Sequence, residues 1–185
     1  MKKHLSYYLG NTLIVLSLLG FLYISYPVLT AYLFPSPPPT ESMKSFAIWI
    51  PKIKAAGEII SEVDPWDKNS YQNALRFGIA HARGFAYPGE KGAIFLFAHS
   101  SGPPWEQTRY NSVFLRLGEL EKGDSITIWR NGKEYQYTVT TKKVVLPQEV
   151  TAVTKVTGNQ LIIQTCTPIG TDYKRLLVFA TEKRI

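Results

Sequence analysis

The chain contains a single cysteine, Cys166, and its neighbours suit nucleophilic chemistry. An apolar run, 161–163, leads into the cysteine, and a second apolar run, 176–180, follows Arg175. Turn-forming residues lie between the runs, so the segment predicts a β-hairpin with a longer loop. Facing strands lie about 4.8 Å apart, so a thiol and a guanidinium can share one small site. Positive charge there favours the thiolate, and the guanidinium offers donors to a developing oxyanion.

The sequence has three histidines, and one of them is well placed to transfer protons. His99 directly follows the apolar run 93–98, which predicts a buried strand, so it lies at a strand end where it can line a cleft. His4 precedes the apolar N-terminal segment and is excluded. His81 lies in a glycine-containing stretch, where we expect a hydrogen bond from its ring to fix the loop. One cysteine and two separated histidines have none of the usual zinc-ligand spacings, so no metal site is predicted.

These residues resemble the active site of sortases. The run Ile162-Ile163-Gln164-Thr165-Cys166, followed nine residues later by Arg175, is similar to the family's active-site hairpin. The family pattern is Thr-Leu-x-Thr-Cys and then an arginine; Thr165 and Cys166 match it, and two isoleucines replace its Thr and Leu. Ala98-His99 resembles the Gly-His that carries the family's catalytic histidine. Ile50-Pro51-Lys52-Ile53 resembles the first strand of the family.

The resemblance covers about residues 48–180 and implies both a fold and a reaction. It implies a closed eight-stranded β-barrel with a few short helices. The expected reaction is acyl transfer through a thioester on Cys166. His99 is expected to form an ion pair with the thiolate, to give its proton to the leaving amine and then to act as base. Arg175 is expected to hold the substrate and to stabilise the oxyanion, with Thr165 as a further oxyanion or substrate contact. The implied substrate is a secreted protein with a C-terminal sorting motif of the Leu-Pro-x-Thr-Gly type, and the acceptor is an amine of the cell wall or of a pilin. No cofactor is predicted, since no dense acidic cluster suggests a calcium site.

The rest of the chain predicts a mostly β fold, because aromatic and β-branched residues are plentiful and turn signals are frequent. Segments 125–130 and 134–141 flank Asn131-Gly132, which is the strongest short-range signal for a hairpin. Tyr71–Phe77 predicts a short helix capped by Ser70, and Asn111–Leu120 predicts one or two helical turns. Gly78–Gly92 is rich in turn formers and predicts a loop. The predicted strands, about eight in number, fit a small closed or nearly closed barrel: one within 46–54 that ends at or near Pro51, and then 58–63, 93–98, 125–130, 134–141, 144–146, 161–166 and 175–180.

The N-terminal segment predicts a membrane anchor. No Asp, Glu, Lys or Arg lies between Lys3 and Glu41, and Leu13–Leu33 is predominantly apolar. Roughly 20 apolar residues span a bilayer, and the lysines near the N-terminus keep that end cytoplasmic. A cleaved signal peptide is the competing reading, but the apolar segment is long and no clean A-x-A site follows it. The predicted organisation is a cytoplasmic tip with a transmembrane signal-anchor, 1–34, a Pro-rich linker, 35–44, and an extracytoplasmic catalytic domain, 45–185.

Composition and motifs argue against several other classes of function and leave one open. The formal net charge is +7 and is spread along the chain, without the basic blocks and interleaved aromatics that indicate nucleic-acid binding. L,D-transpeptidases carry a Ser-His-Gly-Cys motif, and the residues around Cys166 do not match it. A serine hydrolase on Ser100 or Ser101 lacks the G-x-S-x-G elbow. A membrane-anchored binding module, with the cysteine as a small buried hydrophobe, also stays open. The reactivity of the Cys166 thiol distinguishes this binding module from an enzyme, because the poised thiolate of an enzyme alkylates at a lower pH than an ordinary thiol.

Overall fold

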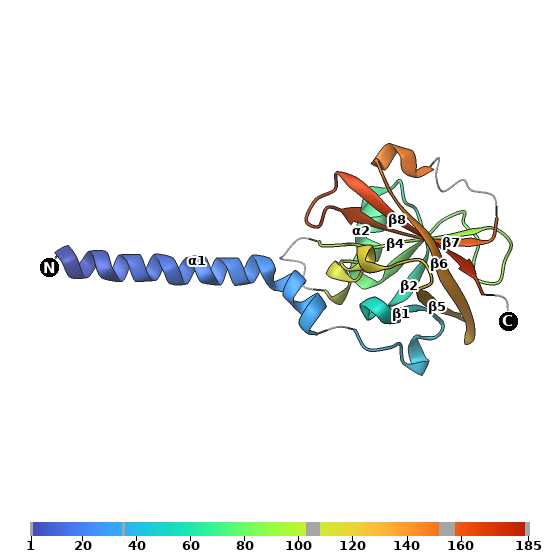
Figure 1. Cartoon of the computed structure of the whole chain (residues 1–185), viewed down its shortest axis with the longest axis horizontal. Helices are drawn as coiled ribbons and strands as arrows, with labels where there is room; N and C mark the ends of the chain where they lie inside the picture. The colour runs from blue at the N-terminus through green and yellow to red at the C-terminus, as the bar shows by residue number, and fades with distance from the viewer. Residues whose placement is uncertain (1, 35, 103–107, 152–157, 184–185) are drawn as a thin grey trace.

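The computed structural model describes residues 2–34, 36–102, 108–151 and 158–183, and it contains a long helix followed by a closed barrel (Figure 1). The helix is α1 (Lys2–Leu33). Strands β1 and β5 pair and so close the barrel. The predicted closed eight-stranded barrel with few helices is therefore confirmed. Around the barrel the strands follow the order β1 (Phe46–Ile50), β2 (Ala55–Val63), β3 (Ile79–Ala82), β4 (Ala93–Phe97), β7 (Gln160–Thr167), β8 (Lys174–Glu182), β6 (Lys133–Val145) and β5 (Ser125–Arg130).

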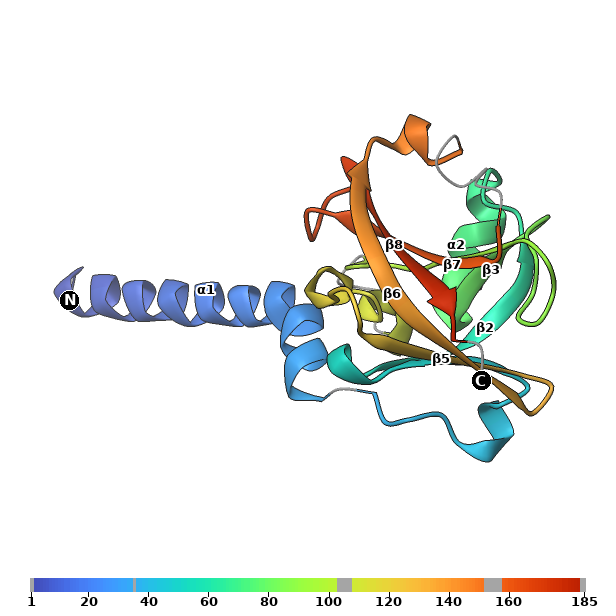
Figure 2. The same ribbon diagram turned by 45° about the vertical axis from the view of Figure 1, so that its right-hand side comes forward.

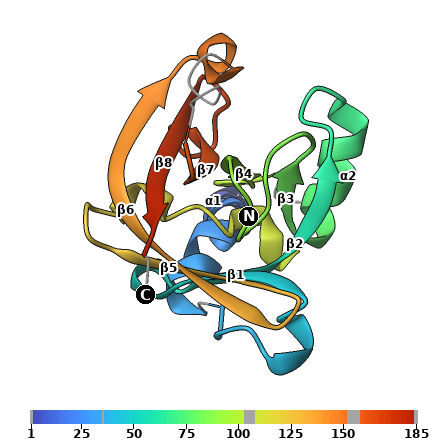
Figure 3. The ribbon, with the colours of Figure 1, turned by 90° about the vertical axis from the view of Figure 1, so that its right-hand side faces the viewer.

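Two of the strand pairs are parallel, and each needs a crossover connection. Between β2 and β3 the crossover is α2 (Lys68–Phe77), which lies outside these strands in Figure 3. Between β4 and β7 the connection is residues 98–159, which carry the β5–β6 hairpin. As a result, the carboxyl ends of β4 and β7 meet at one end of the barrel. Short 3-10 turns complete the fold: η1 (Glu41–Met43), η2 (Pro51–Ile53), η3 (Arg109–Ser112), η4 (Leu117–Glu119) and η5 (Pro147–Glu149).

Aliphatic side chains from the strands fill the barrel and fix the elements that carry the site. Strand β7 is buried on both faces, since Leu161, Ile162 and Ile163 are all inaccessible to solvent. A strand covered on both sides reads as a continuous apolar run rather than an alternating one. Other large side chains that are completely buried include Ile48, Ile50, Ile79, Leu96, Phe114, Leu117, Leu120, Ile126 and Ile128.

Strand β3 lies in the stretch that the sequence predicts as a loop, so that prediction was wrong. Its four residues are all buried, and they pair in parallel with β2 and antiparallel with β4. A strand this short and wholly buried has no alternation to reveal it. Gly78 precedes it because the chain passes very close to β2; a Cβ there would lie 2.8 Å from the Glu58 carbonyl oxygen.

Further boundaries differ from the sequence prediction. Strand β2, predicted from residue 58, begins at Ala55. Helix α2 begins at Lys68, and its N-cap is Asp67, whose side chain accepts from the Asn69 N–H at 3.0 Å; Ser70 lies inside the helix. The segment 144–146 is no separate strand, because β6 continues through a register shift between Val139 and Thr141 up to Val145. The predicted number of strands was therefore right although one was missed and one was split in two.

The hairpin prediction at Asn131-Gly132 is confirmed. Both residues have positive φ, 51° and 76°, which is the requirement of a type I′ turn between twisted strands. The predicted helical turns within 111–120 appear as the 3-10 turns η3 and η4, the first of which begins earlier, at Arg109.

Helix α1 projects from one end of the barrel (Figures 1 and 2). Its segment Tyr7–Tyr26 is long and apolar enough to cross a membrane, by length and composition, and none of it is buried against the barrel. The helix continues beyond this segment, through Pro27, to Leu33.

Candidate active site

Cys166 lies near the end of β7 and faces Arg175 of β8. The antiparallel register pairs the two residues directly. Residues opposite each other in an antiparallel pair project from the same face, with Cβ atoms about 4.5–5.5 Å apart. The register therefore brings the thiol and the guanidinium onto one face of the hairpin, where the sequence had predicted a shared site.

His99 lies two residues beyond β4, and the parallel register with β7 brings it beside Cys166. Phe97 pairs with Gln164, and the Ala98 N–H still donates to the Gln164 carbonyl at 3.2 Å. Two residues further along each chain are His99 and Cys166. Side chains alternate between the faces of a sheet with a period of two; continued two residues past β4, this alternation predicts that His99 and Cys166 project from the face that also carries Arg175. We call these three residues the His–Cys–Arg row.

The backbone of His99 is also fixed by a hydrogen bond to the segment that follows it. Its carbonyl accepts from the N–H of Phe114 at 3.1 Å, and Phe114 is completely buried. The Gly102 N–H donates to the Asn111 carbonyl at 2.8 Å. The chain after β4 is thus fixed against the 3-10 segment that follows it.

A hydrogen bond from the buried Thr165 side chain links the segments that carry Cys166 and His99. The side chain is only 3% exposed, and its Oγ1 donates to the Ala98 carbonyl at 2.9 Å. This bond joins the residue before Cys166 to the residue before His99. The hydroxyl has a positioning role in this structure, and its contact with an oxyanion stays a prediction.

The loop between β7 and β8 orients the Arg175 side chain. Its Nη1 donates to the carbonyl oxygens of Asp172, at 2.7 Å, and of Lys174, at 3.2 Å. Within the described part of the chain, Nε and Nη2 make no hydrogen bond. A guanidinium anchored at one nitrogen keeps further donors, in fixed geometry, for a carbonyl or oxyanion.

Two opposing effects act on the Cys166 thiol. Burial raises the pKa of Cys166 above its ordinary value, and this effect outweighs the lowering by the Arg175 charge; Asp172 adds to the rise. The expectation that positive charge favours the thiolate agrees with the contribution of Arg175, which burial outweighs. Deprotonation of the thiol therefore needs a base.

Two buried polar atoms near the row belong to residues for which the sequence suggested no role in this site; Ser100 was considered only as the nucleophile of a serine hydrolase. Gln164 lies two residues before Cys166, hence on the same face, and Ser100 directly follows His99. The Gln164 Oε1 and the Ser100 Oγ are buried and have no hydrogen-bond partner among the described residues. A glutamine within an otherwise apolar strand was the available signal for the first of them.

His81 lies apart from the row. It pairs with Leu96 of β4 in the β3–β4 register, and Leu96 lies three residues before His99 in the chain. Its Nε2 lies 3.0 Å from the Ala86 carbonyl oxygen, and its ring stacks on Tyr87 with centroids 4.3 Å apart. The structure thus contains the hydrogen bond from the His81 ring that was predicted to fix this loop.

Comparison with known proteins agrees with this geometry. A family model of the Sortase domain matches residues 48–183. The chain belongs to the sortase family. Sortase D of Bacillus subtilis (strain 168) is 30% identical over 145 residues, which cover 76% of this chain and 65% of that protein. The resemblance identified at Thr165-Cys166 and Arg175 is thereby confirmed at the level of the family.

Solved sortase structures have the same fold. Sortase A from Corynebacterium diphtheriae superposes with a TM-score of 0.62 at 26% identity, over 76% of this chain and 60% of that one. The pilus-related Sortase C of Group B Streptococcus gives a TM-score of 0.63 at 29% identity, over 77% of this chain and 69% of that one. The chain thus spans less than two thirds of the length of the Bacillus sortase D and of the Corynebacterium sortase A.

Proposed function

We propose that this chain is a membrane-anchored cysteine transpeptidase of the cell surface. Membership of the sortase family supports acyl transfer as the class of reaction. The observation that supports the proposal is the strand register: it pairs the sole cysteine, Cys166, with Arg175, and it sets the strand that leads into His99 beside the strand of Cys166. Helix α1 is the anchor, with its N-terminus cytoplasmic and the barrel outside, as the lysines at positions 2 and 3 predict.

The first half-reaction forms a thioester. The thiol proton passes to His99 as the Cys166 sulfur attacks the substrate carbonyl carbon. The new C–S bond moves an electron pair onto the carbonyl oxygen, and Arg175 stabilises this oxyanion. When the oxyanion collapses, the C–N bond breaks and His99 gives its proton to the leaving amine. Because burial opposes the thiolate, we propose that His99 takes the thiol proton as the sulfur attacks.

The second half-reaction resolves the thioester. A primary amine attacks the thioester carbonyl, and His99 now accepts the proton of the incoming nitrogen. Arg175 again stabilises the oxyanion; its collapse breaks the C–S bond and regenerates the thiol with the proton from His99. Water in place of the amine gives hydrolysis.

The proposed substrates follow from the family resemblance. The acyl donor is a secreted protein with a C-terminal motif of the Leu-Pro-x-Thr-Gly type, cleaved after Thr, and the acceptor is an amine of the cell wall or of a pilin. We propose that the reaction needs no cofactor. Its chemistry requires only proton transfer and charge stabilisation, which side chains supply.

One observation favours a second candidate, a non-catalytic binding module. Burial raises the thiol pKa, which is typical of an unreactive structural cysteine. Such a protein binds a peptide along the same sheet face without forming an adduct.

The test is turnover of a fluorogenic Leu-Pro-x-Thr-Gly peptide library by the full chain in vesicles, with and without a small amine. We expect amine-dependent product that disappears in Cys166→Ala and His99→Ala. In Arg175→Ala the rate should fall about 10²–10³-fold, as for loss of an oxyanion donor. Arg83→Gln, an exposed arginine away from the row, is the matched control and should keep full activity. A folded protein that turns over no peptide leaves the binding module as the better account.

A further inference from the structure

The loop between β7 and β8 carries a carboxylate, that of Asp172, beside the His–Cys–Arg row. The Arg175 Nη1 donates to the Asp172 carbonyl oxygen at 2.7 Å, and Arg175 pairs with Cys166 in the β7–β8 register. The backbone of Asp172 is thus bonded to the guanidinium that faces the thiol. Its side-chain charge acts on the Cys166 sulfur, in the direction opposite to that of Arg175. This loop residue therefore brings a negative charge to the thiol.

The Asp172 carboxylate is available to bind a cation. The residue is exposed, and among the described residues its carboxylate makes no hydrogen bond or ion pair. The Arg175 side chain contacts the carbonyl oxygen of Asp172 rather than the carboxylate. The turn before it is closed by Thr171, whose N–H and Oγ1 both donate to the Pro168 carbonyl, at 3.1 and 2.8 Å. The loop therefore holds its shape without using the carboxylate.

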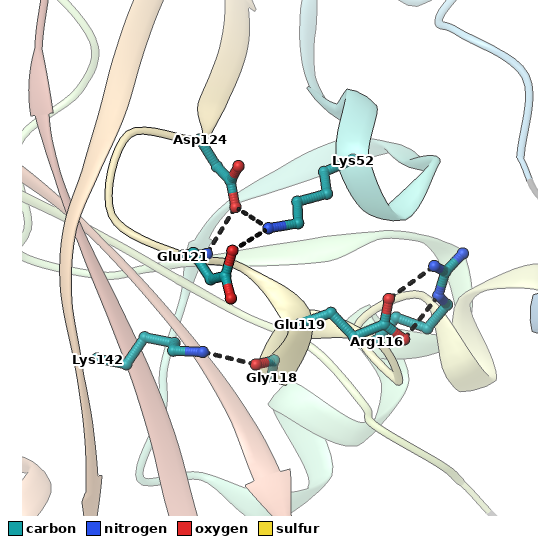
Figure 4. Close-up of polar contacts among 7 residues, drawn as sticks. All are labelled: Lys52, Arg116, Gly118, Glu119, Glu121, Asp124 and Lys142. Carbon is teal, nitrogen blue, oxygen red and sulfur yellow. Dashed lines mark hydrogen bonds and ion pairs between the residues drawn. The ribbon is translucent and has the colours of Figure 1, made fainter.

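Other carboxylates at the same end of the barrel are already paired. Figures 1 and 2 both show η4 and the loop between β7 and β8 at this end. In and just after η4, Glu119 accepts two hydrogen bonds from Arg116, at 2.9 and 2.6 Å (Figure 4). The Lys52 Nζ pairs with Glu121 at 3.0 Å and with Asp124 at 2.9 Å. These three charges are compensated by neighbouring side chains, whereas the carboxylate of the β7–β8 loop is not.

A negative charge beside the thiol is unfavourable in one half of the proposed reaction and favourable in the other. In the first half-reaction negative charge develops on the sulfur and then on the carbonyl oxygen, and a nearby carboxylate opposes both. In the second half-reaction the acceptor is a primary amine. Amines of the lysine type have a pKa of about 10.4, so the acceptor arrives as an ammonium ion at neutral pH. A carboxylate at the site raises the local concentration of such a cation.

We propose that Asp172 selects the acceptor: its carboxylate binds the ammonium group of the incoming amine beside the thioester, in preference to uncharged nucleophiles and to water. This inference rests on the proposed function. The bound ammonium gives one proton to water and becomes a neutral amine, whose nitrogen attacks the thioester carbonyl carbon. His99 takes a second proton from this nitrogen as the C–N bond forms, and returns it to the sulfur as the C–S bond breaks. The products are the amide, the free thiol and one proton in solution.

A competition between two nucleophiles tests this selection. The full chain in vesicles turns over the sorting peptide with ethylamine, an ammonium ion at neutral pH, and hydroxylamine, which is largely uncharged there. Both attack the same thioester, so the ratio of amide to hydroxamate, measured by mass spectrometry, does not depend on how fast the thioester forms. In Asp172→Asn we expect this ratio to fall about two- to fivefold, the range of one exposed charge pair. Asp172→Glu keeps the charge and should retain most of the wild-type ratio.

The matched control is Glu121→Gln, which removes a carboxylate from the same end of the barrel, where Lys52 already pairs with it. Its product ratio should equal that of the wild type. Added salt should lower the wild-type ratio and leave that of Asp172→Asn nearly constant, because salt screens exposed charges. An unchanged ratio in Asp172→Asn, or an equal fall in Glu121→Gln, would overturn the proposal. A folded wild-type protein that forms neither product contradicts the proposed function itself.

Discussion

Replacing Thr165 by valine removes one buried hydrogen bond beside the active site. The Thr165 Oγ1 donates to the Ala98 carbonyl at 2.9 Å, and the side chain is 3% exposed. Valine has nearly the same shape, so the substitution leaves no large cavity. It does leave the Ala98 carbonyl without this donor, and an unpaired buried polar group costs about 1–3 kcal/mol. We expect the free energy of unfolding to fall by that amount.

The same substitution should slow turnover, because the lost bond joins the residue before Cys166 to the residue before His99. Small misplacements of reacting groups cost up to about 100-fold in rate, so we expect kcat to fall about ten- to hundredfold. Urea unfolding with an unchanged m value measures the stability, and peptide turnover measures the rate.

Two variants make this prediction specific. Thr140→Val removes the same kind of bond, from a threonine hydroxyl to the Phe179 carbonyl at 3.1 Å, in the β6–β8 pair. It should lose stability and keep its kcat, whereas Thr165→Ser, which retains a hydroxyl, should stay close to the wild type in both. The reasoning is refuted if Thr165→Val keeps both its stability and its kcat, or if Thr140→Val loses as much turnover.

Three further predictions concern acidity and packing. Burial lowers the pKa of His81 below the ordinary 6.5, so the unfolded chain binds a proton that the folded chain does not. Stability should therefore fall as the pH drops below about 6.5, and urea unfolding should show a smaller fall for His81→Gln. Arg175→Gln should raise the pKa of Cys166 and Asp172→Asn should lower it, because these residues act on the thiol in opposite directions; the rate of Cys166 alkylation against pH measures both changes. Gly78→Ala should destabilise the barrel by about 1–3 kcal/mol, since its Cβ meets the backbone oxygen of Glu58, whereas Gly118→Ala, with 3.7 Å to its nearest atom, should be tolerated. Thermal unfolding compares the two glycine variants.

Local signals made the active-site hairpin and the β5–β6 hairpin predictable. Leu161 to Ile163 reads as a buried strand because β7 is covered on both faces, and Asn131-Gly132 adopts the positive φ values that its turn requires. The family pattern around Cys166 then supplied the register with Arg175. These features depend on residues close together in the chain.

What the sequence did not reveal depends on distant contacts. The Thr165 bond to Ala98 exists only because a long crossover lays β4 and β7 side by side in parallel. The Tyr32 bond to Glu119 joins residues 87 positions apart. The raised thiol pKa follows from burial, which no spacing of charged residues indicates.

The most direct test of the account is the intact mass of the full chain after brief exposure to the sorting peptide without amine. The account predicts an acyl adduct on Cys166 that disappears when a primary amine is added and never forms in Cys166→Ala. His99→Ala and Arg175→Ala should form it far more slowly. If a well-folded protein turns over peptide with no adduct on Cys166, or forms the adduct equally fast in both variants, the His–Cys–Arg row is not the acyl-transfer site.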